Sequence, residues 1–262
     1  MARTSIASVV LASILVATFA AQQPPSRPAT GTGTVLITGS NRGLGLEFAK
    51  QYASRGWRVI ATARQPEAAT ELRAIAAQNR GVSVEKLDVE DVAAIKALAA
   101  KYKATAIDVL INNAGVLGDM QKQNVGSFNK AEFDDVMDVN VFGALAVADA
   151  FLDRVAASTQ KKIVSITSRS GIISQPGRRG PSFYRASKAA LNMVTKLLAE
   201  DLRAEGFRAV ALHPGWVQTR MGGSAAPVPP EQSVQGMLRI IDGLTPEQSG
   251  RAFDFQGRDI RW

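Results

Sequence analysis

A tyrosine and a lysine lie four residues apart in the stretch YRASK, where Tyr184 and Lys188 begin a long, mainly apolar segment. On a helix this spacing puts both side chains on one face. A free phenol has a pKa of about 10, and a neighbouring ammonium lowers this value because it favours the phenolate. The pair could therefore transfer a proton as a general acid or base. Helical spacing alone favours the other interpretation, a tyrosine packed in the core beside a lysine that extends its ammonium to solvent.

A glycine-rich stretch, TGSNRGLG, follows the apolar run at 35–37 and leads into a helical pattern. Glycines let the backbone turn tightly and approach a pyrophosphate at a helix N-terminus, where amide hydrogens and the helix dipole favour negative charge. Strand, loop and helix occur in the order that a dinucleotide site requires. The residues expected to hold the cofactor here are Gly39, Ser40, Asn41, Arg42, Gly43, Leu44 and Gly45.

The end of the second predicted strand lacks the carboxylate that usually binds the ribose hydroxyls of NAD. Thr62 and Ala63 occupy that place, and Arg64 follows them. A guanidinium forms bidentate, charge-assisted hydrogen bonds with phosphate, so Arg64 and Arg42 would suit a 2′-phosphate. We therefore predict NADP(H) in preference to NAD(H). The alternative is that both arginines are solvated surface charges.

Two more polar motifs follow predicted strands, LDV at 87–89 and NNAG at 112–115. Cofactor contacts are expected there, because ligands of parallel sheets bind at the carboxyl ends of the strands. Asp88 could instead cap the next helix, and Asn112 could merely turn the chain. The residues predicted to contact the cofactor are Asp88, Val89, Asn113, Ala114 and Gly115.

Short β-branched runs alternate with Ala- and Leu-rich helical patterns from Thr34 onward. The predicted strands are 35–37, 58–63, 82–87, 109–111, 163–167, 209–212 and 252–255. The predicted helices are 43–55, 66–78, 91–101, 130–157, 184–205 and 230–242. This alternation is typical of βαβ units. We therefore predict an α/β fold: one Rossmann domain with a doubly wound parallel sheet of about seven strands.

Composition narrows the kinds of partner. The 262 residues include no Cys and one His, His213, so neither disulfides nor a metal site is predicted. The formal net charge is +8, but Lys and Arg are dispersed and form no basic stripe interleaved with aromatic residues. A nucleic-acid partner is therefore not expected, and a small anionic ligand fits the charge better.

The first thirty residues differ from the rest of the chain. Arg3 precedes an apolar run from Ile6 to Ala20, and small residues before the Pro-rich segment would suit cleavage after Ala20. We divide the chain into a signal peptide or N-terminal membrane anchor at 1–21, a linker at 22–33 and an NADP-binding domain at 34–262. The protein is then exported, periplasmic or secreted, or else anchored. A transit peptide is a further alternative, and the protein is cytoplasmic if the segment is not a working signal.

The motifs from about residue 33 to 262 resemble those of the short-chain dehydrogenase/reductase family. TGSNRGLG, NNAG, Asn140 in DVNVFGAL, Ser168 in VSITSRSG, YRASK and HPGWVQT occur in the family's order and at its approximate spacing. Within the family, YRASKAALN, HPGWVQTRMGG and the ending GRAFDFQGRDIRW are most similar to C-factor-like and sniffer-type carbonyl reductases. Arg220 stands where an acid commonly follows QT in the C-factor-like pattern, so the charge preference of the substrate lid is left open.

The resemblance implies a catalytic tetrad of Asn140, Ser168, Tyr184 and Lys188. It implies that Asn140 breaks its helix locally and holds a water that links Lys188 to solvent. It also implies that Lys188 and Tyr184 lie against the cofactor. Further cofactor contacts are expected at Pro214, Gly215, Val217 and Thr219.

The expected activity is hydride transfer between the nicotinamide and a small carbonyl or alcohol substrate. Tyr184 is the proton donor or acceptor tuned by Lys188, and Ser168 hydrogen-bonds the carbonyl oxygen, with Thr167 and Ser170 as alternatives in the same stretch. An NADP(H)-binding signalling or surface factor of C-factor type, with little turnover, is the main alternative, and a membrane-anchored reductase is another. A homodimer or homotetramer is expected by analogy.

Overall fold

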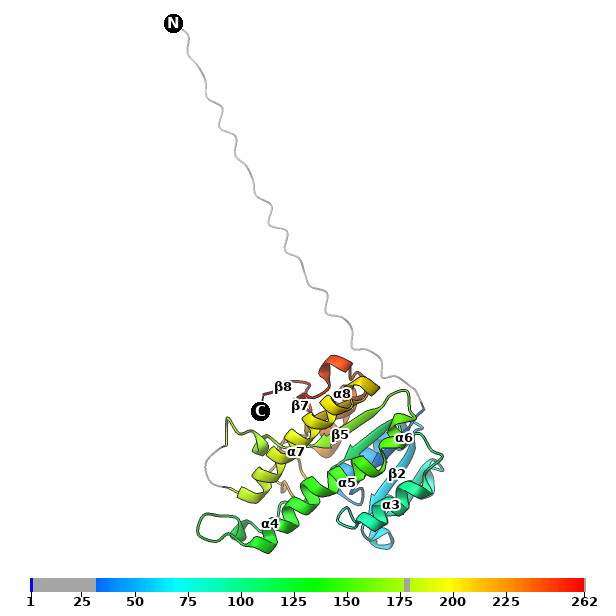
Figure 1. Ribbon diagram of the computed structural model, residues 1–262, viewed down its shortest axis with the longest axis horizontal. Coiled ribbons are helices and arrows are strands. Elements are labelled where there is room, and N and C mark those ends of the chain that lie inside the picture. The colour runs from blue at the N-terminus through cyan, green and yellow to red at the C-terminus, as the bar shows by residue number, and fades with distance from the viewer. Residues whose placement is uncertain (2–31, 177–179, 262) are drawn as a thin grey trace.

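The computed structural model describes residue 1, residues 32–176 and residues 180–261 (Figure 1). The predicted signal peptide or anchor at 1–21 and most of the linker at 22–33 lie outside these residues, apart from Met1 and the last two linker positions. Among the described helices, none combines the length and apolar character needed to cross a membrane.

Eight strands of the described chain form one sheet in the order β3-β2-β1-β4-β5-β6-β7-β8. Every neighbouring pair is parallel except β7 and β8, which are antiparallel. The strands are β1 (Thr34–Ile37), β2 (Arg58–Ala63), β3 (Val82–Lys86), β4 (Val109–Asn112), β5 (Lys162–Ile166), β6 (Arg208–His213), β7 (Ala252–Asp254) and β8 (Asp259–Ile260). All seven predicted strands are confirmed, and the fold is the doubly wound α/β fold that the sequence predicts. The strand order reverses between β1 and β4, which is where such sheets bind ligands.

The helices agree with the predicted pattern except in one place. They are α1 (Gly43–Ser54), α2 (Thr70–Gln78), α3 (Val92–Lys101), α4 (Lys130–Met137), α5 (Gly143–Ala150), α6 (Leu152–Ala156), α7 (Ser182–Asp201) and α8 (Pro230–Asp242). The single helix predicted at 130–157 is wrong, because a π-helical turn at Asp138–Phe142 separates α4 from α5, and α6 follows Phe151. Asn140 lies at the centre of that turn.

Helices cover both faces of the sheet, and each face has its own apolar core (Figure 1). Val35 and Ile37 of β1 face the core beneath α1, α2 and α8, whereas Leu36 faces the core beneath α3, α5 and α7. Because both faces are buried, the strands read as continuous apolar runs rather than as alternating patterns. Because helices cover both faces of the sheet, polar groups can lie together at the edge formed by the carboxyl ends of the strands.

Phe151 gives a direct test of the second core. Its side chain is fully buried between α5 and the sheet, so Phe151→Ala is expected to lower the free energy of unfolding by about 3–5 kcal/mol, from lost burial and the cavity left behind. Met193→Ala, at a position on α7 that is 60% exposed, should change it by less than about 0.5 kcal/mol. Urea unfolding followed by circular dichroism measures both, and equal losses would contradict the assigned core.

Candidate active site

A cleft of about 750 Å³ opens at the carboxyl ends of the central strands. The cleft is lined by the loops after β1, β2, β3, β4, β5 and β6 and by α7. Its lining therefore comes from both sides of the point between β1 and β4 where the strand order reverses. The predicted site residues that line it are Gly39, Asn41, Arg42, Gly43, Leu44, Arg64, Asp88, Val89, Asn113, Ala114, Gly115, Tyr184, Lys188, Pro214 and Thr219. The structure thus brings together residues from six separate motifs of the sequence.

The glycine loop between β1 and α1 is held against the rest of the sheet. Gly39 has a φ of +67°, and a Cβ there would lie 3.0 Å from the backbone of Ala114, so only glycine fits without strain. At Gly45 a Cβ would lie 2.2 Å from the carbonyl oxygen of Gly39. α1 begins at Gly43 with no side-chain cap and no acid in its first turn. Its N-terminus is therefore suited to an anionic group.

Two predicted cofactor contacts in this loop lie behind the cleft instead. Ser40 is fully buried, and its hydroxyl donates to the carbonyl oxygen of Ile37 at 2.9 Å. Gly45 is packed between Gly39 and Asn113. Neither lines the cleft, because both residues serve the close approach of helix and strand.

Thr38 is a site-building residue that the sequence analysis missed. Its hydroxyl accepts hydrogen bonds from the backbone N–H groups of Asn113 and Ala114, each at 3.0 Å. The Asn113 amide in turn donates to the carbonyl oxygens of Thr38 and Gly39, at 2.9 and 3.0 Å. These bonds join the loop after β1 to the loop after β4. The clue was available, since Thr38 is the first polar residue after an apolar strand.

Two cations stand at the end of the cleft formed by the loops after β1 and β2. Arg42 and Arg64 line it and are exposed, and neither forms an ion pair with another described residue. Asp88 also lines the cleft. The cap of α3 is Asp91, whose carboxylate accepts from the N–H of Ala94 at 2.9 Å. The alternative that Asp88 caps this helix is therefore wrong, and one oxygen of its carboxylate accepts instead from the N–H of Glu90 at 3.3 Å.

Lys188 is buried, although Tyr184 and Lys188 do share one face of α7. The lysine is 5% exposed, its ammonium donates to the carbonyl oxygen of Ile166 at 2.9 Å, and burial lowers its pKa to about 8. The ammonium lies 5.7 Å from the centre of the Tyr184 ring. The interpretation in which the lysine extends to solvent is therefore wrong.

The electrostatics of Tyr184 differ from the expectation in one respect. Burial raises the pKa of its phenol, and a side-chain hydrogen bond with Ser168 partly offsets this rise. Lys188 is not among the groups that shift it, so the predicted lowering by the ammonium is not what this geometry produces. Desolvation dominates because the phenol is enclosed between α7 and the loop after β5.

Ser168 occupies the place that the resemblance assigns to it. It follows β5 and caps a short 3-10 turn at Arg169–Gly171, where its hydroxyl accepts from the N–H of Ser170 at 3.1 Å. Ser168 does not line the cleft, but its hydroxyl is near enough to the Tyr184 phenol to lower the pKa of that phenol. Thr167 is buried and donates to Asn192 instead. Ser168 is thus the serine beside the phenol.

Asn140 links three elements from inside the π turn. It is 1% exposed, its amide oxygen accepts from the N–H of Val116 at 2.8 Å, and its amide nitrogen donates to the Val116 carbonyl and to the Ser187 hydroxyl, each at 2.9 Å. Val116 follows β4, and Ser187 precedes Lys188 on α7. A Cβ on Gly115 would lie 3.1 Å from Asn140 Oδ1 and 3.6 Å from Lys188 Nζ. Asn140 therefore sets the wall against which the lysine lies.

The segment after β6 forms another wall of the cleft. Pro214 and Thr219 line the cleft with Arg220 and Met221, which were not among the predicted contacts. Two predicted contacts do not line it. Gly215 turns with a φ of +87° against Phe255. Val217 is 4% exposed and forms a β-bridge with Val228.

A glycine loop at the first strand of a doubly wound sheet, with a serine, a tyrosine and a lysine at the same edge, defines a dinucleotide-type α/β oxidoreductase site. The model of the short chain dehydrogenase family matches residues 33–228, and the chain belongs to this family.

Three similar proteins place the chain within the family. C-signal of Myxococcus xanthus is 44% identical over 168 residues, which are 64% of this chain and all of that protein. The NADPH-bound carbonyl reductase from chicken fatty liver is 33% identical, with a TM-score of 0.82 over 88% of this chain and 99% of the other. The carbonyl reductase Sniffer of D. melanogaster is 30% identical, with a TM-score of 0.83 over 88% and 100%. The predicted C-factor-like and sniffer-like character is confirmed.

The buried ammonium of Lys188 predicts a pH-dependent stability. Its pKa falls from 10.5 to about 8 on folding, so between these values the unfolded chain binds a proton that the folded chain does not. Stability therefore rises with pH across this window, by on the order of 2 kcal/mol relative to a Lys188→Met variant. Urea unfolding at pH 7.5 and at pH 10 measures the free energy of unfolding of the wild-type protein and of Lys188→Met, and hence how the difference between them changes with pH. Lys196→Met, at an exposed position, is the control. If the free energy of unfolding of Lys188→Met differs from that of the wild type by the same amount at both pH values, the burial of Lys188 is contradicted.

Proposed function

We propose that the protein is an NADP(H)-dependent oxidoreductase that interconverts a small carbonyl compound and its alcohol. The observation that carries this proposal is that Tyr184 and Lys188 line the cleft together, with the Lys188 ammonium 5.7 Å from the centre of the phenol ring and Ser168 near the phenol. Membership of the short-chain dehydrogenase family and similarity to an NADPH-bound carbonyl reductase support it.

The cleft fits a dinucleotide with a 2′-phosphate. The glycine loop leaves room for a pyrophosphate at the N-terminus of α1, since a Cβ on Gly39 would meet Ala114. Arg42 and Arg64 supply guanidinium groups at the ribose end, and no acid stands at the end of β2. When bound, the nicotinamide supplies or accepts the hydride at the carbonyl carbon.

Ser168 and Tyr184 together handle the charge that grows on the carbonyl oxygen. The Ser168 hydroxyl donates a hydrogen bond to that oxygen, and Tyr184 delivers the proton that completes the alcohol. Because burial raises the pKa of the phenol, Tyr184 is protonated at neutral pH. This state suits a proton donor, and the geometry therefore favours the reductive direction.

Lys188 supports the phenol from behind. One N–H of its ammonium is bonded to the Ile166 carbonyl, so the others are available to hydroxyl groups in the cleft that it lines. With a pKa of about 8, the side chain is cationic at neutral pH and can donate charge-assisted hydrogen bonds to those hydroxyl groups. Asn140 keeps this site shaped through its bonds to Val116 and Ser187.

A second candidate function is an NADP(H)-binding signalling factor with little turnover, which the similarity to C-signal over 168 residues favours. Purified residues 22–262, assayed with NADPH and NADH against aldehydes, ketones and quinones, distinguish the two functions. Tight NADPH binding without turnover of any carbonyl would support the factor and overturn the enzyme.

Tyr184→Phe tests the proton donor. We expect it to lower kcat by about 10²-fold or more, because the phenol is the group that protonates the carbonyl oxygen. Tyr52→Phe is a matched control: this buried tyrosine of α1 lies outside the cleft, and its hydroxyl has no hydrogen-bond partner in the described structure. Steady-state NADPH oxidation measures both variants, and an unchanged rate for Tyr184→Phe would discard the mechanism.

Arg64→Asp tests the cofactor preference. The carboxylate would repel a 2′-phosphate and accept hydrogen bonds from ribose hydroxyls, so kcat/KM should shift from NADPH toward NADH by about 10²-fold. Arg80→Asp makes the same change of charge at an exposed position outside the cleft, and it should leave the ratio within about twofold. A ratio that is also unchanged in Arg64→Asp would mean that Arg64 does not contact the phosphate.

A further inference from the structure

The first turn of α7, which carries Tyr184, lacks a cap from its own sequence. The residue before the helix is Pro181, which supplies no side-chain cap. Tyr184 is the third residue of the helix, so its backbone N–H is one of the donors that an α-helix leaves unpaired. Such a donor needs a partner from elsewhere when it is shielded from water.

Gln123 is that partner, although it lies 61 residues earlier in the chain. Its side-chain oxygen accepts from the N–H of Tyr184 at 3.0 Å. The residue has no exposed surface, which is unusual for a glutamine. The helix is therefore capped from outside, at the residue that carries the phenol.

The orientation of the Gln123 amide follows from its other two hydrogen bonds. Its nitrogen donates to the carbonyl oxygens of Leu117 and Asp119, at 2.9 and 3.2 Å. A flipped amide would place its nitrogen against the N–H of Tyr184 and its oxygen against two carbonyl oxygens. Only the observed orientation satisfies every group.

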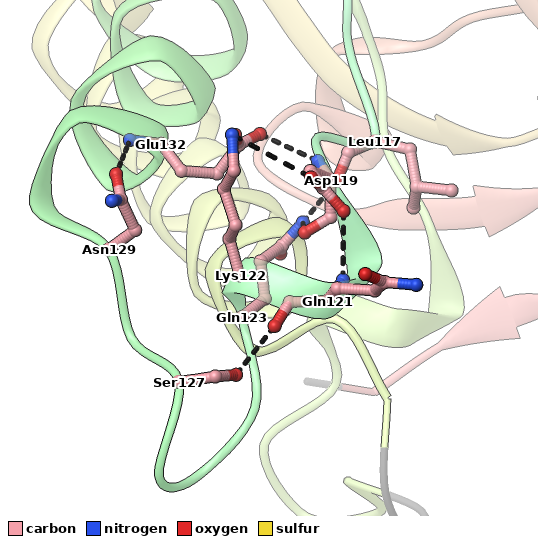
Figure 2. A network of polar contacts seen from close by, with 8 residues as sticks. All are labelled: Leu117, Asp119, Gln121, Lys122, Gln123, Ser127, Asn129 and Glu132. Carbon is pink, nitrogen blue, oxygen red and sulfur yellow. Dashed lines mark hydrogen bonds and ion pairs between the residues drawn. The ribbon is translucent and has the colours of Figure 1, made fainter.

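The segment that carries Gln123 is fixed to α4 by polar contacts (Figure 2). The carboxylate of Glu132, in the first turn of α4, accepts from the backbone N–H of Asp119 at 2.6 Å. The Lys122 ammonium lies within 4 Å of the side-chain carboxylates of Asp119 and Glu132. Gly118 turns with a φ of +76°, and a Cβ there would lie 2.7 Å from both the Gln123 nitrogen and Glu132. The segment therefore has little freedom to move Gln123 away from α7.

The neighbour of Tyr184 is held by the same segment. The ring of Phe183 lies 5.4 Å from that of Phe128 and 5.3 Å, edge to face, from that of Phe133 on α4. Two consecutive residues of the first turn are thus anchored, one through its side chain and the other through its backbone N–H.

We propose that Gln123 is a positioning residue for Tyr184, which holds the first turn of α7 so that the phenol meets Ser168. The assignment rests on the proposed function for its catalytic consequence. Displacement of a reacting group by about 1 Å costs on the order of 10²-fold in rate, so a loosened first turn would lower catalysis while the cofactor cleft, which Gln123 does not line, stays intact.

The test compares Gln123→Met with Gln121→Met in the full-length protein. Methionine keeps the length of the side chain but accepts no useful hydrogen bond, and Gln121 is an exposed glutamine of the same turn whose side chain makes no hydrogen bond with a described residue. We expect Gln123→Met to speed exchange of the Tyr184 amide hydrogen by about tenfold or more and to lower kcat by about tenfold. The KM for NADPH should stay within about twofold, and Gln121→Met should leave all three quantities unchanged.

Gln123→Glu adds a readout that a purely structural role would not move. A protonated carboxyl at this buried site can still accept from Tyr184 and donate to one carbonyl, whereas the carboxylate is repelled by both carbonyl oxygens. The kcat of Gln123→Glu, divided by the kcat of the wild type at the same pH, should therefore be closer to one at pH 5.5 than at pH 8. A ratio that does not vary with pH would contradict the assigned contacts.

Hydrogen exchange separates this inference from the proposed function. Unchanged exchange at Tyr184 in Gln123→Met overturns the anchoring whatever the activity, and accelerated exchange with unchanged kcat overturns the positioning role. If the wild-type protein turns over no carbonyl, the proposed function fails, while the exchange rates still decide whether Gln123 anchors Tyr184.

Discussion

The site depends on a lysine ammonium that the fold removes from water. Lys188 is 5% exposed on the buried face of α7, and its acceptor among the described residues is the Ile166 carbonyl at the end of β5. A parallel sheet makes this arrangement possible, because the carbonyl groups beyond its last ladder bonds are free at the carboxyl edge. A charge with one protein acceptor weakens the folded state. The stability of the fold is therefore reduced at the cleft, which Lys188 lines.

The π turn at Asp138–Phe142 solves a related geometric problem. In a regular α-helix each residue is rotated by about one hundred degrees from the one before it. In that arrangement the side-chain amide of Asn140 would not point toward the loop after β4. The extra residue in the turn lets the Asn140 side chain bond both backbone groups of Val116 and the Ser187 hydroxyl at once. Asparagine is a poor helix residue for the reason that makes it useful here, since its amide competes for backbone partners. The irregularity thus couples the β4 loop to α7.

Most of the fold could be predicted because each element carries its own local pattern. The seven parallel strands are apolar runs flanked by turn residues, and the helices show their period within about a dozen residues. β8 escaped prediction because two residues, Asp259 and Ile260, carry no pattern and pair with β7 only through the tertiary structure. The break at Asn140 is implied by the family resemblance alone, because the apolar pattern continues on both sides of it. Ser40 and Gly45 were assigned to the cofactor because spacing identifies a loop but not which side of it faces the cleft.

Tyr184 shows why side-chain chemistry is harder to predict than topology. Spacing on α7 places the ammonium and the phenol on one face, but whether charge or desolvation governs the phenol depends on how completely the neighbouring loops cover it. Those loops, described at 116–129 and 169–176, have no periodic pattern, and the contact of Gln123 with the Tyr184 backbone spans 61 residues. The part of the cleft around the loops after β1 and β4 is built from glycines and strand ends, which the sequence displays. The part around Tyr184 is built from long-range hydrogen bonds to single backbone groups, which become visible only once the chain is folded.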